Sequence, residues 1–169
     1  MAPQAVRSAL VITASDGANA GVREDTSGAR VAARLETLGF SVDRRVLPDE
    51  QWELEEALTA GAADHALVVT TGGTGLTPRD VTPQATSAVV DYEVPGLAEA
   101  MRAVGRAVTP LADLSRAVVG VRGRCLIVNL PGSPKGALES LDALVPVLDH
   151  ALETLAGPFD HDAPEARDR

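Results

Sequence analysis

With 169 residues the chain has the usual size of one domain, large enough to bury a core without a disulfide or a structural metal. Hydrophobic residues make up 45% and charged residues 23%, as in globular proteins, and the net charge of −9 disfavours a protein that wraps nucleic acid. The single cysteine excludes an intrachain disulfide, and the sequence has neither a membrane-spanning apolar run nor a signal-peptide pattern, so we expect a cytoplasmic protein.

The first predicted elements are a strand, a loop and a helix. The apolar run 8–13 predicts a buried strand, and the polar residues 15–26 predict a loop. Ser27 is predicted to cap a helix whose apolar residues recur on one face, and Gly39 is placed to end it.

A second strand and a second helix follow, and a third strand comes after them. Residues 40–46 predict the second strand, which Pro48 ends. Asp49 is predicted to cap a helix that continues through Leu58. The apolar run 66–69 predicts the third strand.

The second half predicts two short helices, two strands and one long helix. The short helices are expected over 83–90 and 95–106, and the strands over 117–121 and 124–130. The long helix carries a stripe of apolar residues that must be buried on the sheet or on another subunit: Leu138, Leu141, Val145, Leu148, Leu152 and Leu155. We expect one domain over residues 5–156 and a flexible acidic tail over residues 157–169.

Alternation of strands and helices predicts an α/β fold, with three layers (α/β/α) and a mostly parallel sheet that has helices on both faces. Loops at the carboxyl ends of such strands form the ligand crevice. Three loops are expected to converge there: 15–16, 71–80 and 129–136. The last contains Lys135, the only lysine of the chain, and either a phosphate contact or chance explains its position.

The most informative segment is residues 71–83, Thr-Gly-Gly-Thr-Gly-Leu-Thr-Pro-Arg-Asp-Val-Thr-Pro. Bare glycines let backbone N–H groups approach an anion closely. The segment is neither a Walker P-loop, which requires a Gly-Lys-Ser or Gly-Lys-Thr, nor a G-x-G-x-x-G fingerprint. It is either a tight strand-to-helix turn or a phosphate-binding loop, and the proline-flanked Arg79 and Asp80 favour the second interpretation.

Five single residues are interpreted as functional, structural or either. Asp80 offers hard oxygen ligands for magnesium. Asp49 is either a helix cap or a second ligand of the same ion. Asp16 either binds a ligand hydroxyl or closes an Asx turn. Ser115 is a ligand contact or an ordinary loop residue, whereas Cys125, in an apolar run, is predicted to be a core residue.

Several segments resemble the molybdenum-cofactor biosynthesis family, which comprises the MogA/MoaB-type bacterial proteins and the equivalent domain of gephyrin and its plant counterparts. The resemblance extends over about residues 8–155. It rests on the following residues: Thr71-Gly-Gly-Thr-Gly with Thr77-Pro-Arg-Asp-Val-Thr-Pro, Leu114-Ser-Arg, Asn129-Leu-Pro-Gly-Ser-Pro, Pro48-Asp-Glu, and Ser15-Asp16 with Gly21, Asp25, Ser27 and Gly28. One departure is Gly17, where many relatives carry a bulkier residue, often arginine.

The resemblance implies a molybdopterin-binding fold, a homotrimer, and adenylylation of molybdopterin with Mg-ATP, which releases pyrophosphate. It implies that Asp49 and Asp80 are the catalytic residues and hold the magnesium ion. The implied substrate-binding residues are Asp16, Gly72, Gly73, Thr74, Gly75, Ser115, Asn129, Pro131, Gly132 and Ser133. A molybdenum-insertion protein is an implied partner.

Two alternatives stay open. A carrier would bind molybdopterin or a precursor without catalysis, as MoaB-like relatives suggest. An oligomer-forming scaffold is also compatible with the apolar stripe, but it leaves Asp49 and Asp80 unexplained.

Overall fold

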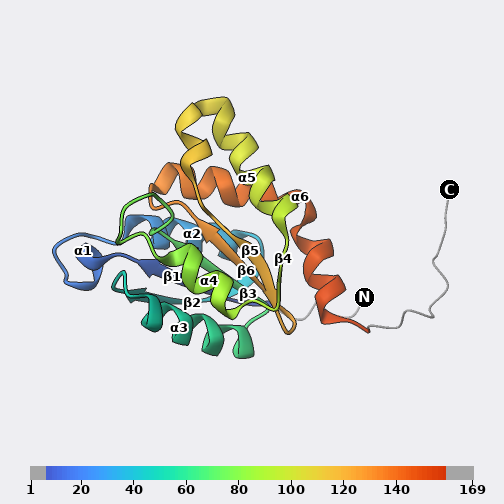
Figure 1. The fold of residues 1–169 in the computed structure, drawn as a ribbon. Helices are drawn as coiled ribbons and strands as arrows, with labels where there is room; N and C mark the ends of the chain where they lie inside the picture. Colours follow the sequence, from blue (N-terminus) through green and yellow to red (C-terminus); the bar gives the residue numbers. More distant parts are fainter. Residues whose placement is uncertain (1–6, 159–169) are drawn as a thin grey trace.

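A computed structural model describes residues 7–158 of the chain, and within them six strands form one sheet in the order β2-β1-β3-β6-β5-β4 (Figure 1). The strands are β1 Arg7–Ala14, β2 Phe40–Leu47, β3 Leu67–Thr71, β4 Tyr92–Glu93, β5 Val119–Arg122 and β6 Cys125–Leu130. The helices are α1 Asp16–Asn19, α2 Thr26–Thr37, α3 Gln51–Asp64, α4 Thr82–Val89, α5 Pro95–Val108, the 3₁₀ helix η1 Pro110–Leu114 and α6 Pro134–Ala156.

The sheet is parallel over four strands and antiparallel at one edge. β2, β1, β3 and β6 pair in parallel, whereas β5 pairs antiparallel with both β6 and β4. The mostly parallel sheet is therefore confirmed. Three short elements were not predicted, because segments this short carry little periodicity: β4, η1, and α1, which forms within the predicted loop 15–26.

Helices cover both faces of the sheet, which confirms the three-layer α/β/α fold (Figure 1). Alternate residues of β1 show why both layers form. Ala9 and Val11 pack with α2, α5 and α6, whereas Leu10 and Ile12 pack with α3 and α4. A strand buried on both faces needs a continuous apolar run rather than an alternating one, as the sequence provides.

The predicted stripe of the long helix α6 is confirmed at Leu141, Leu148, Leu152 and Leu155 but not at its other two positions. Leu138 and Val145 are only half-buried, whereas Ala137 and Leu144 are buried. The contacts of α6 with α2, β6 and α5 set which face of the helix is covered. None of these three neighbours can be read from the sequence of the helix itself. The helix bends partway along its length (Figure 1), and Pro146 lies inside it.

Two predicted helix caps are wrong. Asp25, not Ser27, caps α2, since its Oδ1 accepts a hydrogen bond of 2.9 Å from the N–H of Gly28. Glu50, not Asp49, precedes α3, and it makes no capping hydrogen bond with its side chain. Asp49 is therefore available for another role.

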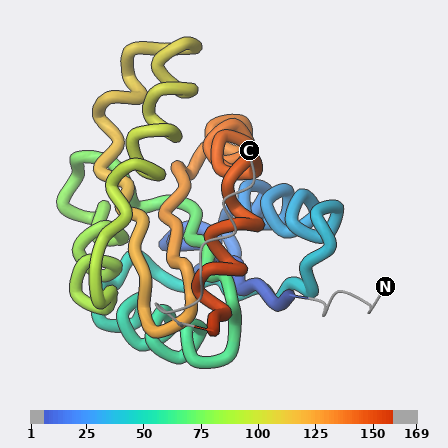
Figure 2. Tube along the Cα trace, turned by 90° about the vertical axis from the view of Figure 1, so that its right-hand side faces the viewer, coloured from blue at the N-terminus to red at the C-terminus, as the bar shows by residue number. Residues whose placement is uncertain are grey.

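Helices α5 and η1 project from the body of the molecule in both views (Figures 1 and 2). No helix within the described residues has the length and apolarity needed to cross a membrane. The predicted tail lies almost wholly outside the described residues.

Candidate functional site

The carboxyl ends of the parallel strands bring the predicted loops together. The N–H of Ser15, after β1, donates to the carbonyl of Leu47 at the end of β2 over 2.9 Å. The N–H of Gly72, after β3, donates to the carbonyl of Leu130 at the end of β6 over 3.1 Å. These bonds tie neighbouring strand ends to one another, so the loops that follow form one edge of the sheet.

The turn after β3 requires glycine at two positions. Gly72 and Gly73 have φ of +93° and +65°, and a Cβ on Gly72 would lie only 2.3 Å from the carbonyl oxygen of Ala14. Thr82, the first residue of α4, fixes the turn. Its hydroxyl donates to the carbonyl of Gly72 over 2.9 Å, and its N–H donates to the carbonyl of Gly73. The turn is thus rigidly held against both the first strand and the following helix.

A polar cavity of about 590 Å³ opens beside this turn. Six of the predicted site residues line it: Asp49, Asp80, Gly72, Gly73, Gly132 and Ser133. Other lining residues come from the segment between β1 and α2, among them Arg23 and Asp25. The structure therefore brings the two candidate catalytic aspartates and the bare backbone of the glycine turn to one cavity.

Asp49 is held by a reciprocal pair of hydrogen bonds with Asp16. The Asp16 N–H donates to Asp49 Oδ2 over 2.9 Å, and the Asp49 N–H donates to Asp16 Oδ1 over 3.0 Å. Burial raises the pKa of the Asp49 carboxyl, and the nearby carboxylates of Asp16 and Asp80 raise it further. Asp49 Oδ1 takes no hydrogen bond within residues 7–158, and this oxygen would lie 3.3 Å from a Cβ on Gly73.

Arg79 donates hydrogen bonds to the carboxylates of Asp16 and Glu50. It donates through Nε and Nη2 to Asp16, over 3.1 and 2.9 Å, and through Nη1 to Glu50 over 2.9 Å. The guanidinium lowers the pKa of Asp16. Asp16 itself does not line either cavity, and it contacts the cavity through Asp49 and Arg79, to which it is hydrogen-bonded. Its direct contact with a substrate stays a prediction.

Asp80 is held in its ionised form by its own loop. Asp80 Oδ2 accepts hydrogen bonds from the hydroxyl and the N–H of Thr77, over 2.6 and 2.8 Å. The Thr77 hydroxyl is the largest of the contacts that lower the pKa of Asp80. The two aspartates thus face one cavity with opposite pKa shifts.

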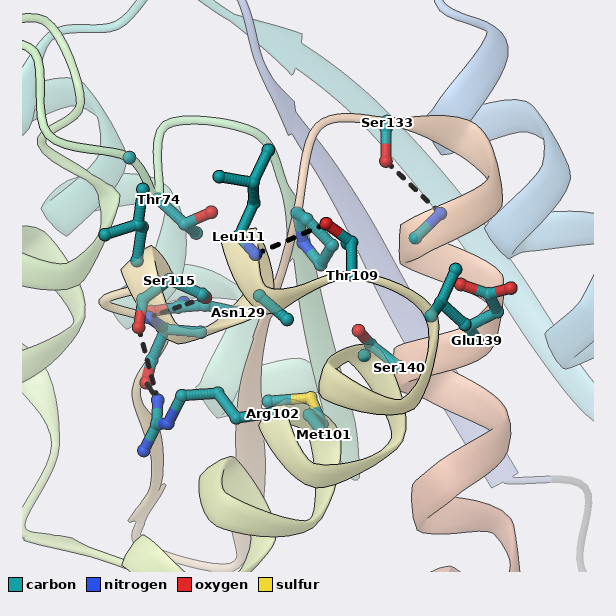
Figure 3. Close-up of a pocket in the computed structure, with 18 residues that line it drawn as sticks. Thr74, Met101, Arg102, Thr109, Leu111, Ser115, Asn129, Ser133, Glu139 and Ser140 are labelled. Atoms are coloured by element: carbon teal, nitrogen blue, oxygen red, sulfur yellow. Dashed lines mark hydrogen bonds between the residues drawn. The ribbon is translucent and has the colours of Figure 1, made fainter.

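A second, mainly apolar cavity of about 310 Å³ is lined by Thr74 and Gly75 of the glycine loop (Figure 3). Helices α5, η1 and α6 form most of its wall. Six predicted site residues line it: Thr74, Gly75, Ser115, Asn129, Pro131 and Ser133. Ser133 lines both cavities, and its hydroxyl accepts the Gly136 N–H at the start of α6. The glycine loop therefore separates two adjoining cavities of different polarity.

Asn129 uses its side chain within the protein. It is fully buried, its amide donates to the hydroxyls of Thr70 and Thr86 over 3.1 and 2.8 Å, and its Oδ1 accepts the Val118 N–H. The hydrogen bond between the Asn129 side chain and Val118 lies at the end of the paired region of β5 and β6. Asn129 therefore helps to set the path of the segment that carries Ser115 towards the cavity.

Arg116 is a site-supporting residue that we did not predict. Its Nε donates to the Gly75 carbonyl over 2.7 Å, its Nη2 donates to the Asp80 carbonyl, and its Nη1 reaches Gln84 over 3.2 Å. Its N–H also donates to the Thr74 carbonyl. The planar guanidinium suits several acceptors at once, so Arg116 holds the glycine loop between the cavities. Its place in Leu114-Ser-Arg was the only signal in the sequence.

Three other features of the sequence bear on the site. Lys135 is exposed and lies 3.8 Å from Glu139, one turn along α6, and it lines neither cavity. Cys125 is a core residue, as predicted, and burial raises the pKa of its thiol to about 12. Within the described residues no three carboxylate, histidine or cysteine side chains form a group that could hold a metal ion.

Comparison with known proteins agrees with the resemblance in the sequence. The family model of a probable molybdopterin binding domain matches residues 10–150. A Helicobacter pylori protein named molybdopterin adenylyltransferase is 38% identical over 156 residues, which cover 88% of each chain.

Solved structures agree as well. The molybdopterin biosynthesis Mog protein from Mycobacterium ulcerans is 45% identical with a TM-score of 0.85, and the match covers 89% of this chain and 99% of that one. The molybdopterin biosynthesis enzyme MoaB from Thermus thermophilus is 49% identical with a TM-score of 0.82, covering 90% and 98%. Since the family model covers most of the sheet and both cavities, the chain belongs to the family of the probable molybdopterin binding domain.

Proposed function

We propose that the protein adenylylates molybdopterin with ATP and releases pyrophosphate, a step of molybdenum cofactor biosynthesis. The observation that carries the proposal is the convergence of Asp49 and Asp80 on one polar cavity with the bare backbone of Gly72 and Gly73. Relatives such as the Helicobacter pylori protein carry the name of this activity. A second, apolar cavity beyond the glycine loop gives room for a second substrate.

A magnesium ion fits the donors that are present. Asp49 and Asp80 supply two carboxylates, and Asp49 Oδ1 has no hydrogen-bond partner among the described residues. Magnesium in nucleotide sites is usually bound by one or two carboxylates together with substrate phosphates and water, so a group of three protein ligands is not required. When bound, the ion would neutralise charge on the phosphates.

The reaction needs little proton transfer, which suits a site without histidine. An oxygen of the molybdopterin terminal phosphate attacks the α-phosphorus of ATP. The bond from that phosphorus to the bridging oxygen breaks, and pyrophosphate leaves with the electron pair. The protein's part is to position the phosphates and to offset their charge, through the Gly73 N–H of the turn, since the Gly72 N–H donates to the Leu130 carbonyl. Ser133, which lines both cavities, is placed where the two substrates would meet.

The alternative, a carrier without catalysis, is not favoured, because the curated relatives described above are named as an enzyme of this activity. Three further expectations belong to the proposal. They are a homotrimer, a molybdenum-insertion protein as partner, and a cytoplasmic location. Exposed apolar side chains on the projecting α5 and η1, among them Val108, Leu111 and Leu114, support a contact with another chain.

Pyrophosphate release from molybdopterin and Mg-ATP tests the proposal. We expect activity in the wild type and a loss of about 10²-fold or more in Asp80→Asn, which is the order of magnitude of losing one electrostatic group of a site. Asp142→Asn is a matched control, since Asp142 is exposed on α6 and pairs with Arg34 away from both cavities. Its rate should stay within about twofold of the wild type. Full activity in Asp80→Asn would show that the assignment is wrong, and binding without pyrophosphate release would favour the carrier.

A further inference from the structure

Arg23 lies in the wall of the polar cavity, in the segment that joins α1 to α2. The same cavity is lined by Asp49, Asp80 and the glycine turn. Neither Asp49 nor Asp80 forms a hydrogen bond or ion pair with Arg23 in the described part of the chain. Its position alone raises the question of what its charge does there.

The charges around the cavity leave Arg23 without a counter-charge. The other arginine of the wall, Arg79, is matched by Asp16 and Glu50. Asp25 is matched by Arg44, at 2.6 Å. The Arg23 side chain makes no hydrogen bond or ion pair with any residue in the range 7–158; its backbone N–H donates to the Gly17 carbonyl over 3.1 Å. Its guanidinium is therefore the cation of this wall that is free to meet an anion.

The aliphatic part of the Arg23 side chain lies next to Gly17. A Cβ on Gly17 would lie 3.5 Å from Arg23 Cβ and 3.8 Å from Arg23 Nε. The side chain therefore passes over the bare backbone of Gly17 in α1, and the residue is exposed to solvent. A Cβ at position 17 would be in van der Waals contact with the Arg23 side chain, so the two positions are neighbours at this edge of the cavity.

We infer that Arg23 binds a phosphate group in the polar cavity. The inference rests on the proposed function, which brings two phosphate-bearing substrates to this site. A triphosphate next to Asp49, Asp80 and Glu24 meets an acidic wall, and an unpaired guanidinium offsets that repulsion. Arginine is also the cation whose planar fork matches phosphate oxygens.

Binding and kinetics of Arg23→Gln test the inference. Because hydrogen bonds to charged groups are the stronger ones and Arg23 is exposed, we expect the Kd of ATP and of tripolyphosphate, each with Mg²⁺, to rise roughly tenfold. Arg30→Gln is the matched control, since Arg30 is exposed on α2 and lines neither cavity. Both variants should melt within about 2 °C of the wild type, because the Arg23 side chain has no hydrogen-bond or ion-pair partner among residues 7–158.

The outcomes separate the two phosphate sources. Weaker binding of ATP and tripolyphosphate supports a contact with the nucleotide, and an unchanged nucleotide Kd with a raised KM for molybdopterin supports a contact with the pterin's phosphate. Values within twofold of the wild type for all three would overturn the inference. Because tripolyphosphate binding needs no turnover, a wild type that binds it but releases no pyrophosphate would contradict the proposed function and still measure the role of Arg23. A wild type that binds no phosphate compound would overturn both.

Discussion

Replacing Arg116 with glutamine should weaken both the fold and the reaction. The substitution removes charged hydrogen bonds to the carbonyls of Gly75 and Asp80, and each such bond is worth about 1.5–3 kcal/mol. Because Arg116 is half-buried, water can bond to the two carbonyls in part. We therefore expect the free energy of unfolding to fall by about 2–4 kcal/mol. For a domain of this size the melting temperature should fall by roughly 5–15 °C.

The effect on the reaction should exceed the effect on stability. The loop that Arg116 holds carries Thr74 at one cavity and Asp80 at the other. A displacement of about 1 Å in such groups lowers a rate by about 10²-fold, so kcat for pyrophosphate release should fall by that order while the protein is still folded. Arg116→Lys should be intermediate, since an ammonium keeps the charge but has no planar fork to reach both carbonyls.

Arg122→Gln provides the matched control. Arg122 donates to the Val89 carbonyl over 2.6 Å and lines neither cavity. Its loss should lower the melting temperature without changing kcat at a temperature where the variant is folded. The reasoning would be refuted if Arg116→Gln melted within about 2 °C of the wild type and kept its rate within twofold.

Three further predictions concern the glycine turn, the core and pH. Gly73→Ala should destabilise the protein by about 1–3 kcal/mol and abolish nucleotide binding, because φ is +65° and the new Cβ would lie 2.3 Å from Thr82 Oγ1; wild-type values in urea unfolding and ATP titration would contradict this. Asn129→Leu should cost at least about 3 kcal/mol, because it leaves two buried hydroxyls and an N–H unpaired, and a loss below 1 kcal/mol would count against the network. The buried thiol of Cys125, with a pKa of about 12, stays protonated in the fold but ionises near pH 9 when unfolded. The free energy of unfolding should therefore fall by about 1 kcal/mol between pH 8.5 and 10, and no such fall should occur in Cys125→Ala.

Most strands and helices could be predicted because their signals are local. The run at 8–13 is apolar without alternation, which only a strand covered on both faces requires, and the structure extends it to Arg7–Ala14. The stripe of α6 shows the limit. Its period was visible, but α2, α5 and the sheet decide which side is buried, so Ala137 and Leu144 are in the core in place of Leu138 and Val145.

Helix caps illustrate the same limit in the site. Both Asp25 and Ser27 suit a cap, so residue type could not choose between them. Before α3, residue type favours Asp49, yet Glu50 holds the cap position. The choice depends on partners far along the chain. Asp49 exchanges hydrogen bonds with Asp16, which lies 33 positions earlier. The two residues are close because they follow β2 and β1, which are adjacent parallel strands.

The sequence by itself determined the α/β class, the glycine turn and the identity of the two candidate aspartates, because these depend on apolar runs and on residue types within one segment. Only the tertiary structure decided that Gly72 and Thr74 line different cavities, that Asp16 is hydrogen-bonded to Asp49, and that Arg116 holds the loop. Hydrogen bonds of this kind join loops that follow different strands. Their partners are set by the order of strands in the sheet, which no local pattern of residues contains.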